Sequence, residues 1–420
     1  MNPDSAASPA PSRRVAYFVM RYPLLTQTFI DREMRGVMGH GLEVEVHPLW
    51  DWGNREPAAP DGPRILRYRF LSICARASFA ALRNPRLVWS GIRAVWRHRP
   101  SDAEGWFMTI WGGVFALGKA AEFRARTVHG EDVDWLHGAW ATAPATTALA
   151  LSALLGKPFS FGAHAYDLYR HGGDPLLPHK LCLARFVHTT TQANVESIQQ
   201  RFPDRTAEII LARRGLTHLA PLRPAAAIDS KNVRLLSVGR LVEKKGHALQ
   251  LAACAELRQR GIDARLRIIG EGPERRRLES RIGELDLGSG VTLEGAMAPA
   301  DVQSAYDESD VLLHTGVVDA EGDRDGLPNV IPEAMAHGLC VISSPGGGAA
   351  EAVAHEKTGL IADPHDSVAL ADAIVRLVND SALRERIRIN AHQWVVENFL
   401  AARNTAKLAA AMRGQAAIGR

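Results

Sequence analysis

Short apolar runs alternate with amphipathic segments along most of the chain. Buried-type strands are expected at residues 15–20 and 43–49, with a helix between them at 29–38. The rhythm resumes in the second half, where a strand at 233–238 precedes a helix at 248–260. Repeated strand–helix units predict parallel sheets that bind ligands at the carboxyl ends of their strands. We therefore predict an α/β protein with two Rossmann-like, doubly wound domains.

Interruptions of this rhythm set the expected domain boundaries. We expect a disordered leader at 1–14, an N-terminal Rossmann-like domain at 15–218, a linker at 219–231, a C-terminal Rossmann-like domain at 232–395, and a C-terminal helix at 396–420 that crosses back to the N-terminal domain. The linker is rich in proline and alanine and has no periodicity. The leader has no apolar core, which argues against a signal peptide. No apolar run reaches the roughly 18 residues that a spanning helix needs.

Composition limits which cellular compartment and which kinds of binding partner we expect. The chain has 420 residues and a formal net charge of +4, too mild to indicate a general polyanion binder, and we predict no nucleic-acid partner. The four cysteines are Cys74, Cys182, Cys254 and Cys340. They form no C-x-x-C pair, which is typical of buried thiols in a reducing cytoplasm.

A basic and aromatic segment stands apart. Residues 64–100 contain nine arginines, no acidic residue, and aromatic residues such as Trp89 and Trp96 at helical spacing. Such interleaving is typical of an interfacial helix on anionic lipid. An ordinary amphipathic helical pair with solvated arginines is the alternative. We expect the insertion to span about 64–118 and to hold the protein on the inner face of the cytoplasmic membrane.

The richest chemistry lies between residues 319 and 351. An acidic, glycine-punctuated loop ends in Gly326, Leu327, Pro328 and Asn329, and a short apolar helix and a buried strand at 340–343 follow. A helix start near Asn329 suits a phosphate. Asp325 and Glu333 frame it with two carboxylates, which suit sugar or ribose hydroxyls.

A cationic loop follows the strand at 233–238. It begins at Gly239 and offers Arg240, a planar bidentate donor, and Lys245, a mobile point charge. This arrangement suits a diphosphate, although charge runs are more often solvated surface. Gly295 follows another expected strand and is a further candidate contact.

Two candidates lie in the N-terminal half. Thr28 ends the loop after the first strand, where it contacts a ligand or only caps the next helix. His164 follows a strand directly, within His164-Ala165-Tyr166-Asp167, and is a ligand contact or a structural histidine. His137 is a weaker candidate of the same kind.

These motifs resemble the Glu-x7-Glu region of family 4 retaining glycosyltransferases (glycosyltransferase group 1) of the polysaccharide-biosynthesis type. The usual form reads E-G-L-P-N-V-x-x-E-A-M-A, and Asp325 departs from it by replacing the first Glu. The G-R-L-x-x-x-K-G pattern at 239–246 and the His-x-x-Asp pattern at His164 fit the same family. The resemblance implies the GT-B fold, two Rossmann-like domains facing a central cleft. It also implies that Gly295 contributes to nucleotide binding.

The resemblance further implies a function. A nucleotide-diphosphate sugar would donate its sugar to a glycan or lipid-linked oligosaccharide. Glu333 would bind the ribose and Asp325 the transferred sugar, while His164 would position that sugar. Arg240 and Lys245 would stabilise the departing diphosphate, so we expect no cofactor and no metal. The D-x-D pairs at 132–134 and 323–325 lack the single-domain context of the metal-dependent fold.

Three alternatives from other classes stay open. A nucleotide-sugar epimerase shares the two-domain fold and needs acids able to protonate the sugar carbon. A non-catalytic nucleotide-sugar binding protein would bind a donor without turnover. A nucleic-acid binder rests on the arginine segment alone.

Overall fold

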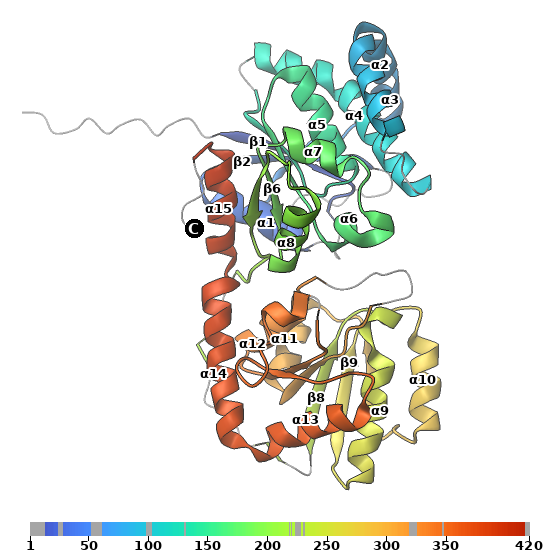
Figure 1. The fold of residues 1–420 in the computed structure, drawn as a ribbon, viewed down its shortest axis with the longest axis vertical. Coiled ribbons are helices and arrows are strands. Elements are labelled where there is room, and N and C mark those ends of the chain that lie inside the picture. The colour runs from blue at the N-terminus through green and yellow to red at the C-terminus, as the bar shows by residue number, and fades with distance from the viewer. Residues whose placement is uncertain are drawn as a thin grey trace, which may run out of the picture. The chain divides into compact units, whose positions relative to one another are not determined.

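The structure is a computed structural model of the chain. It describes residues 13–23, 28–51, 61–97, 103–129, 132–217, 219, 221–222, 228–229, 232–318, 326–346 and 348–415. Residues 1–12 of the predicted leader and most of the predicted linker lie outside the described residues, and Arg14 already belongs to the first strand. The chain divides into two compact units, one of residues 1–190, 194–214 and 401–420 and one of residues 191–193 and 215–400. We call them the N-terminal and C-terminal units and describe each by itself (Figure 1).

The N-terminal unit is built on a seven-stranded parallel sheet with the order β3-β2-β1-β4-β5-β6-β7. Its strands are β1 (Arg14–Val19), β2 (Glu43–Pro48), β3 (Arg64–Ile65), β4 (Trp135–Gly138), β5 (Phe159–Gly162), β6 (Phe186–Thr189) and β7 (Glu208–Leu211). Its helices are α1 (Thr28–Gly39), α2 (Phe70–Arg83), α3 (Pro85–Arg97), α4 (Ala103–Val128), α5 (Ala143–Leu155), α6 (Ala165–Tyr169), α7 (Leu177–Leu183), α8 (Gln192–Arg201) and α15 (Ala401–Met412), with a 3-10 turn at Arg170–Gly172.

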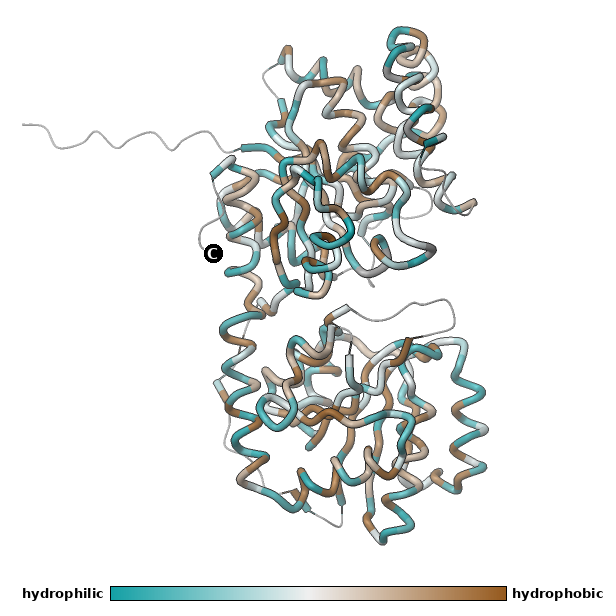
Figure 2. The backbone as a smooth tube through the Cα atoms, in the orientation of Figure 1, coloured by the Kyte–Doolittle hydropathy of each residue, from teal (hydrophilic) through white to brown (hydrophobic). Residues whose placement is uncertain are grey.

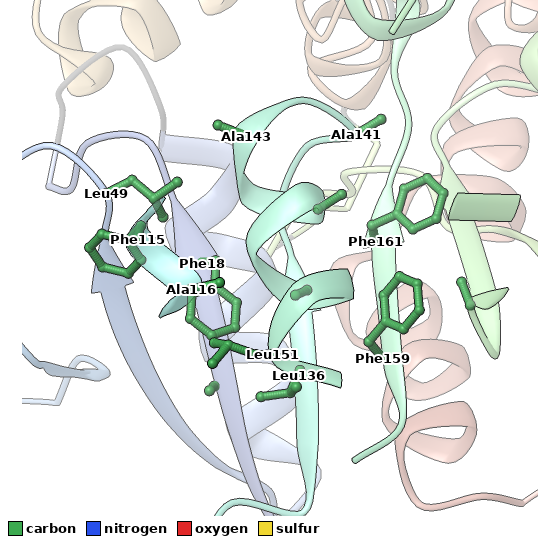
Figure 3. Close-up of a cluster of buried hydrophobic side chains, with 14 of the residues drawn as sticks. Phe18, Leu49, Phe115, Ala116, Leu136, Ala141, Ala143, Leu151, Phe159 and Phe161 are labelled. Atoms are coloured by element: carbon green, nitrogen blue, oxygen red, sulfur yellow. The ribbon is translucent and has the colours of Figure 1, made fainter. Parts of the chain in front are cut away.

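Alternation along β1 shows why this sheet is covered on both faces. Ala16 and Phe18 join a core with α4 and α5, whereas Val15, Tyr17 and Val19 join a second core with α1 and α15. Successive side chains of a strand point to opposite faces, so a strand that is apolar throughout requires two layers of helices. Figure 3 shows the first core, in which aromatic side chains from the strands meet α4 and α5.

The last helix, α15, belongs to the N-terminal unit although it ends the chain. It packs beside α1, and Leu408 and Met412 are buried against that face of the sheet. The side chain of Thr405 occupies the space that a Cβ at Gly36 of α1 would need. The two helices therefore meet at close range.

The C-terminal unit has a six-stranded parallel sheet with the order β10-β9-β8-β11-β12-β13. Its strands are β8 (Val233–Val238), β9 (Ala264–Ile269), β10 (Val291–Gly295), β11 (Val311–His314), β12 (Cys340–Ser343) and β13 (Leu360–Ile361). Its helices are α9 (His247–Gln259), α10 (Arg275–Glu284), α11 (Pro299–Asp307), α12 (Val330–Ala336), α13 (Ser367–Asn379) and α14 (Ser381–Asn398), with 3-10 turns η3 (Glu243–Lys245) and η4 (Gly348–Glu351). One core includes residues of α9, α10 and α13, the other includes residues of α11 and α12, and α14 contributes to both. Both units thus confirm the predicted fold class.

The predicted insertion forms α2, α3 and α4, and only part of it is surface. Trp111, Phe115 and Ala116 of α4 are buried in the core beside α5. The sequence predicts that the apolar run at 106–117 extends the exposed surface of residues 64–100. Only part of it does so, because one side of α4 is buried against the sheet. Figure 2 shows how hydrophilic and hydrophobic residues intersperse along α2 and α3.

Candidate active site

The loops at the carboxyl ends of β8 and β9 pack backbone against backbone. Gly239 N–H donates to the Ile269 carbonyl at 2.9 Å, and Leu241 N–H donates to the Glu271 carbonyl at 2.9 Å. Gly270 has φ +149°, and a Cβ at this position would lie 1.9 Å from the Gly239 carbonyl oxygen. Only glycine allows this approach. The G-x-G turn after β9 therefore supports the cationic loop.

A buried polar network holds the same loop from below. Thr315 Oγ1 donates to the Gly246 carbonyl at 3.0 Å and accepts from Gln250 Nε2 at 2.9 Å. His247 lies with Nε2 3.2 Å from the Arg240 carbonyl oxygen and Nδ1 3.2 Å from Ser237 Oγ. Burial lowers the pKa of His247, so the neutral imidazole is favoured. The backbone of the loop is thus fixed at both of its ends.

This fixed loop presents two cations at the edge of the sheet. The Arg240 side chain is exposed, and the structure gives it no hydrogen bond or ion pair to the residues it describes. The aliphatic stem of Lys245 lies over Gly239, since a Cβ there would be 3.5 Å from Lys245 Cδ and Cε. Lys245 therefore reaches back toward Arg240, which gathers positive charge where β8 ends.

Glu333 is held by a partner that sequence motifs did not indicate. Tyr306 of α11 is buried and donates its hydroxyl to Glu333 Oε2 at 3.2 Å. Burial and the neighbouring Glu333 carboxylate raise the pKa of Tyr306 well above its ordinary value. The phenol therefore stays protonated and orients the carboxylate. A single Tyr near the end of a mixed polar helix shows no signal of this role without the fold.

The loop from Gly326 to Asn329 is anchored by packing. Leu327 is buried in the apolar core, so only its backbone can face a ligand. Gly348 lies so close beneath the loop that a Cβ would be 2.3 Å from Leu327 N. Asn329 Oδ1 is buried and accepts no hydrogen bond from the residues that the structure describes. Pro328 is buried as well.

The remaining candidates have different surroundings. Gly295 ends β10 with φ +80°, and a Cβ there would lie 3.1 Å from a Glu271 carboxylate oxygen. Asp325 lies outside the described residues, as does the second D-x-D pair at 323–325. Thr28 is the first residue of α1, and its side chain is likewise not described. The edge of the C-terminal sheet thus collects Arg240, Lys245, Glu333, Asn329 and Gly295, each following a strand or opening a helix at its carboxyl side.

The His-x-x-Asp pattern forms a local turn in the N-terminal unit. Asp167 Oδ2 accepts the backbone N–H of His164 at 3.0 Å, which fixes the loop after β5. Burial raises the pKa of Asp167 to about 7. His164 is buried, and its Nδ1 has no hydrogen-bond partner among the described residues. His137 is also buried, in β4.

The carboxylates of the first D-x-D pair, at 132–134, contact other residues of the N-terminal unit. Asp132 forms an ion pair with Lys157, and Asp134 accepts the backbone N–H of Arg14 at 2.9 Å. Each carboxylate therefore has a structural partner at the amino-end side of the N-terminal sheet. Both act in holding β1, β4 and the entry to β5 together.

Comparison with known proteins finds glycosyltransferases among those similar to this chain. Residues 221–394 match the family described as glycosyl transferases group 1. The putative colanic acid biosynthesis glycosyltransferase WcaL of Escherichia coli is 27% identical over 92% of this chain and 98% of its own. The amylovoran biosynthesis glycosyltransferase AmsK of Erwinia amylovora is 37% identical over 36% of this chain and 37% of its own.

Solved structures agree on the architecture. Sucrose-phosphate synthase from Thermosynechococcus elongatus matches with a TM-score of 0.70 at 19% identity, covering 96% of this chain and 98% of its own. Anabaena HepE, solved with UDP and glucose, matches with a TM-score of 0.65 at 15% identity, covering 96% and 100%. The family match and the relatives show what the chain is similar to, and the solved structures show that it has the GT-B fold.

Proposed function

We propose that the protein is a metal-independent, retaining glycosyltransferase of family 4 that uses a nucleotide-diphosphate sugar. The observation that carries the proposal is the fixed loop that presents Arg240 and Lys245 at the carboxyl edge of the C-terminal sheet. Charge on the departing diphosphate grows in the transition state, and preorganised cations stabilise that growing charge. Two cations here would do what a divalent ion does in other folds.

The other residues receive roles from their positions. Glu333, oriented by Tyr306, would accept hydrogen bonds from the ribose hydroxyls. Backbone groups of Gly326 to Asn329 would contact the phosphates and the sugar, and Gly239 and Gly295 would line the nucleotide. Asp325 would bind the transferred sugar. His164 would position that sugar from the N-terminal unit, and Thr28 is a further contact proposed for the donor.

Relatives suggest the acceptor. WcaL and AmsK are named for colanic acid and amylovoran biosynthesis, both polysaccharides. We propose that this enzyme transfers a sugar in exopolysaccharide or cell-surface polysaccharide synthesis, to a hydroxyl of a glycan or a lipid-linked oligosaccharide in the cytoplasm. An epimerase of the same fold would release UDP only slowly, and a binding protein would not release it.

The test is binding and turnover of UDP-, GDP- and ADP-sugars by the purified protein in EDTA. We expect one nucleotide sugar to bind and to release its nucleoside diphosphate faster when a glycan acceptor is added. Release by an epimerase would stay slow and would not depend on the acceptor. Glu333→Ala should abolish binding, whereas Glu397→Ala, a change on α14, should leave it intact. NMR of the glycoside product should show the donor's anomeric configuration. Loss of activity in EDTA would contradict metal independence, and an inverted product would contradict retention.

We further propose that α2, α3 and the start of α4 hold the enzyme on anionic membrane. None of the described helices has the length and apolarity needed to cross a bilayer. These helices instead expose large apolar side chains: Phe70, Leu71, Phe79, Leu82, Trp89, Ile92, Trp96, Phe107 and Ile110. In α3, Trp89 and Trp96 are 70% and 61% exposed and recur with Ile92 at i, i+3 and i+7, so they share one side.

The arginines of α3 favour a membrane surface of anionic lipid. Arg86, Arg93 and Arg97 follow i, i+7 and i+11 spacing, so they form a row beside the tryptophans. Arg67 and Arg76 of the neighbouring region pair with Asp51 and Glu122 and are less available. Each arginine near an anionic surface contributes about 1 kcal/mol of attraction. An arginine row next to exposed tryptophans is suited to the interface of an anionic leaflet.

Liposome sedimentation tests this surface. We expect binding to vesicles that contain phosphatidylglycerol, weakening with salt, and little binding to phosphatidylcholine alone. Replacing both Trp89 and Trp96 with Ala should release the protein, whereas Ile389→Ala, which removes an exposed apolar side chain of the C-terminal unit, should not. Equal binding by the tryptophan variant would contradict the proposal.

A further inference from the structure

A fully buried lysine of α7 lies close to the carboxyl ends of two neighbouring strands of the N-terminal unit. Lys180 has no exposed surface, and its ammonium group donates to a carboxylate oxygen of Asp174 at 2.8 Å. The Asp174 side chain is itself only 3% exposed. The same ammonium group donates to the carbonyl of Ala141 and, at 3.3 Å, to the carbonyl of Thr142. Three acceptors from two separate segments therefore surround one buried cation.

The two carbonyls belong to the loop that joins β4 to α5. The carbonyl of Thr142 also accepts the N–H of Thr146 at 3.0 Å, which is the first full turn of α5. Lys180 therefore binds this loop at the point where the helix starts. Because β4 ends at Gly138, the contact fixes the chain directly beyond the carboxyl end of that strand.

Asp174 connects the same lysine to the turn after β5. Its Oδ1 also accepts the N–H of Leu176 at 3.0 Å, and its own N–H donates to the carbonyl of Asp167 at 2.8 Å. Asp167 Oδ2 in turn accepts the N–H of His164 at 3.0 Å. Hydrogen bonds thus run without a break from Lys180 to the backbone of His164.

The chain returns on itself between His164 and Asp174 at close range. Gly173 has φ +95°, and a Cβ there would lie 2.9 Å from the carbonyl oxygens of Asp167 and Leu168. Only glycine combines this backbone conformation with this approach. Leu168 is fully buried in the core. The turn that carries His164 is therefore compact, and a displacement of Asp174 is transmitted to it.

A buried ion pair is a poor source of stability. Removing two charges from water costs free energy, and replacing both partners with neutral side chains is often neutral or stabilising. Burial lowers the pKa of Lys180, while the Asp174 carboxylate opposes that shift. An ammonium group with three fixed acceptors does, however, hold each acceptor in one place. The pair between Lys180 and Asp174 is thus better suited to positioning backbone than to stabilising the fold.

A second lysine–aspartate pair of the same unit provides the comparison. Lys157 pairs with Asp132, and both side chains are 26% exposed. Asp132 also accepts the N–H of Val133 at 2.8 Å, so it combines an ion pair with a backbone contact as Asp174 does. Asp132 precedes β4 and Lys157 precedes β5. This second pair therefore lies at the amino ends of the two strands whose carboxyl ends adjoin Lys180.

We propose that Lys180, through its pair with Asp174, is a positioning residue that holds the turn carrying His164 and the loop after β4 in a fixed relation. The proposal rests on the proposed function in one respect, that His164 contacts the transferred sugar. Lys180 has no exposed surface, so it acts through His164 and does not touch the substrate. Its loss should impair sugar transfer without weakening the binding of the nucleotide by the C-terminal unit.

The test compares two double variants of the full chain that remove charge in matched ways. Lys180→Met with Asp174→Asn removes both buried charges and keeps an oxygen that can accept the N–H of Leu176. Lys157→Met with Asp132→Asn makes the same change at the amino ends of the strands. We expect the first variant to lower turnover of the nucleotide sugar roughly 10- to 100-fold, with an unchanged dissociation constant for the nucleoside diphosphate. The second variant should change neither quantity.

NMR of labelled histidine imidazoles reports on His164 without any turnover, and His164→Gln assigns its resonance. The double variant at Lys180 and Asp174 should shift the His164 resonance and leave that of His247, in the C-terminal unit, in place. The control double variant should move neither resonance. If the first double variant does not fold, Asp174→Asn alone replaces it with the same expectations.

Three results would overturn the proposal. These are an unchanged His164 resonance in the variant at Lys180, equal turnover by the two double variants, and a loss of nucleoside diphosphate binding in proportion to the loss of turnover. A wild-type protein that neither binds nor turns over a nucleotide sugar would contradict the proposed function. The His164 resonance would still decide whether Lys180 positions the turn, so the two failures are distinguishable.

Discussion

The two units organise polar groups in opposite ways on similar sheets. In the C-terminal unit, cations and backbone groups lie in loops beyond the strand ends, and the supporting network lies beneath them. In the N-terminal unit, Glu33, His137 and His188 lie within α1, β4 and β6 themselves, between two layers. Loops can present charge to a ligand without burying it. A buried cluster carries a desolvation cost, which the Tyr17 hydroxyl and the Arg214 charge offset in part for Glu33.

The largest expected effect concerns the loop charges. Arg240→Ala should lower turnover of the nucleotide sugar on the order of 10²-fold, because one preorganised charge that stabilises the leaving group is lost. Steady-state release of the nucleoside diphosphate measures it. Arg277→Ala is the control, because it removes an exposed arginine of α10 whose one ion pair with a described residue is to its neighbour Glu274. Similar rates for both variants would remove Arg240 from the site.

The next effect tests whether the loop depends on backbone packing. Gly270→Ala places a methyl group against the Gly239 carbonyl and should reduce unfolding free energy by about 2–3 kcal/mol. Gly283→Ala, in α10 with open space around it, should instead be neutral or stabilise by up to about 1 kcal/mol. Urea denaturation of both variants measures this. A Gly270→Ala protein as stable as the wild type would show that the loops are less tightly packed.

The pH dependence of stability tests how much free energy the ionisation of the buried Glu33 costs. Burial raises the pKa of Glu33 to about 7 from an ordinary value of 4.5, so its ionisation destabilises the folded state as pH rises through about 7. Glu33→Gln stays neutral. It should therefore be close to the wild type in stability near pH 4.5 and more stable by about 1–3 kcal/mol at about pH 8.

Denaturation midpoints at several pH values provide the comparison. His137, His164 and His188 all have pKa values lowered by burial, so they destabilise both proteins on the acid side. Their contribution largely cancels in the difference between wild type and variant. A stability difference that does not change with pH would show that Glu33 carries no ionisation cost.

The smallest expected effect concerns the hydrogen bond that Tyr306 donates to Glu333. Tyr306→Phe removes the hydroxyl that donates to Glu333 and should cost about 1 kcal/mol of donor binding energy, or roughly fivefold in affinity. Titration calorimetry with the nucleotide sugar measures it. Folding should be retained, since Phe fills the same buried space. An unchanged affinity would mean that Glu333 keeps its orientation without Tyr306.

The parallel α/β architecture follows from local patterns along the chain, because strand–helix repeats and all-apolar strands leave few other folds. It also located the loop from Gly239 to Gly246 and the stretch around Glu333, since contiguous glycines and charges carry their own geometry. Leu327 shows the limit of that approach, because a motif residue proved to be a core side chain.

Tertiary structure alone decided which distant residues meet. Tyr306 of α11 donates its hydroxyl to Glu333 of α12. Thr315 accepts from Gln250 and donates to the carbonyl of Gly246, which lies 69 residues earlier in the sequence. Glu33, His137 and His188 come from three separate elements, Arg214 follows β7, and the four share no spacing pattern. Register in a parallel sheet aligns residues far apart in the chain, so such a cluster is defined by strand order and not by any local motif.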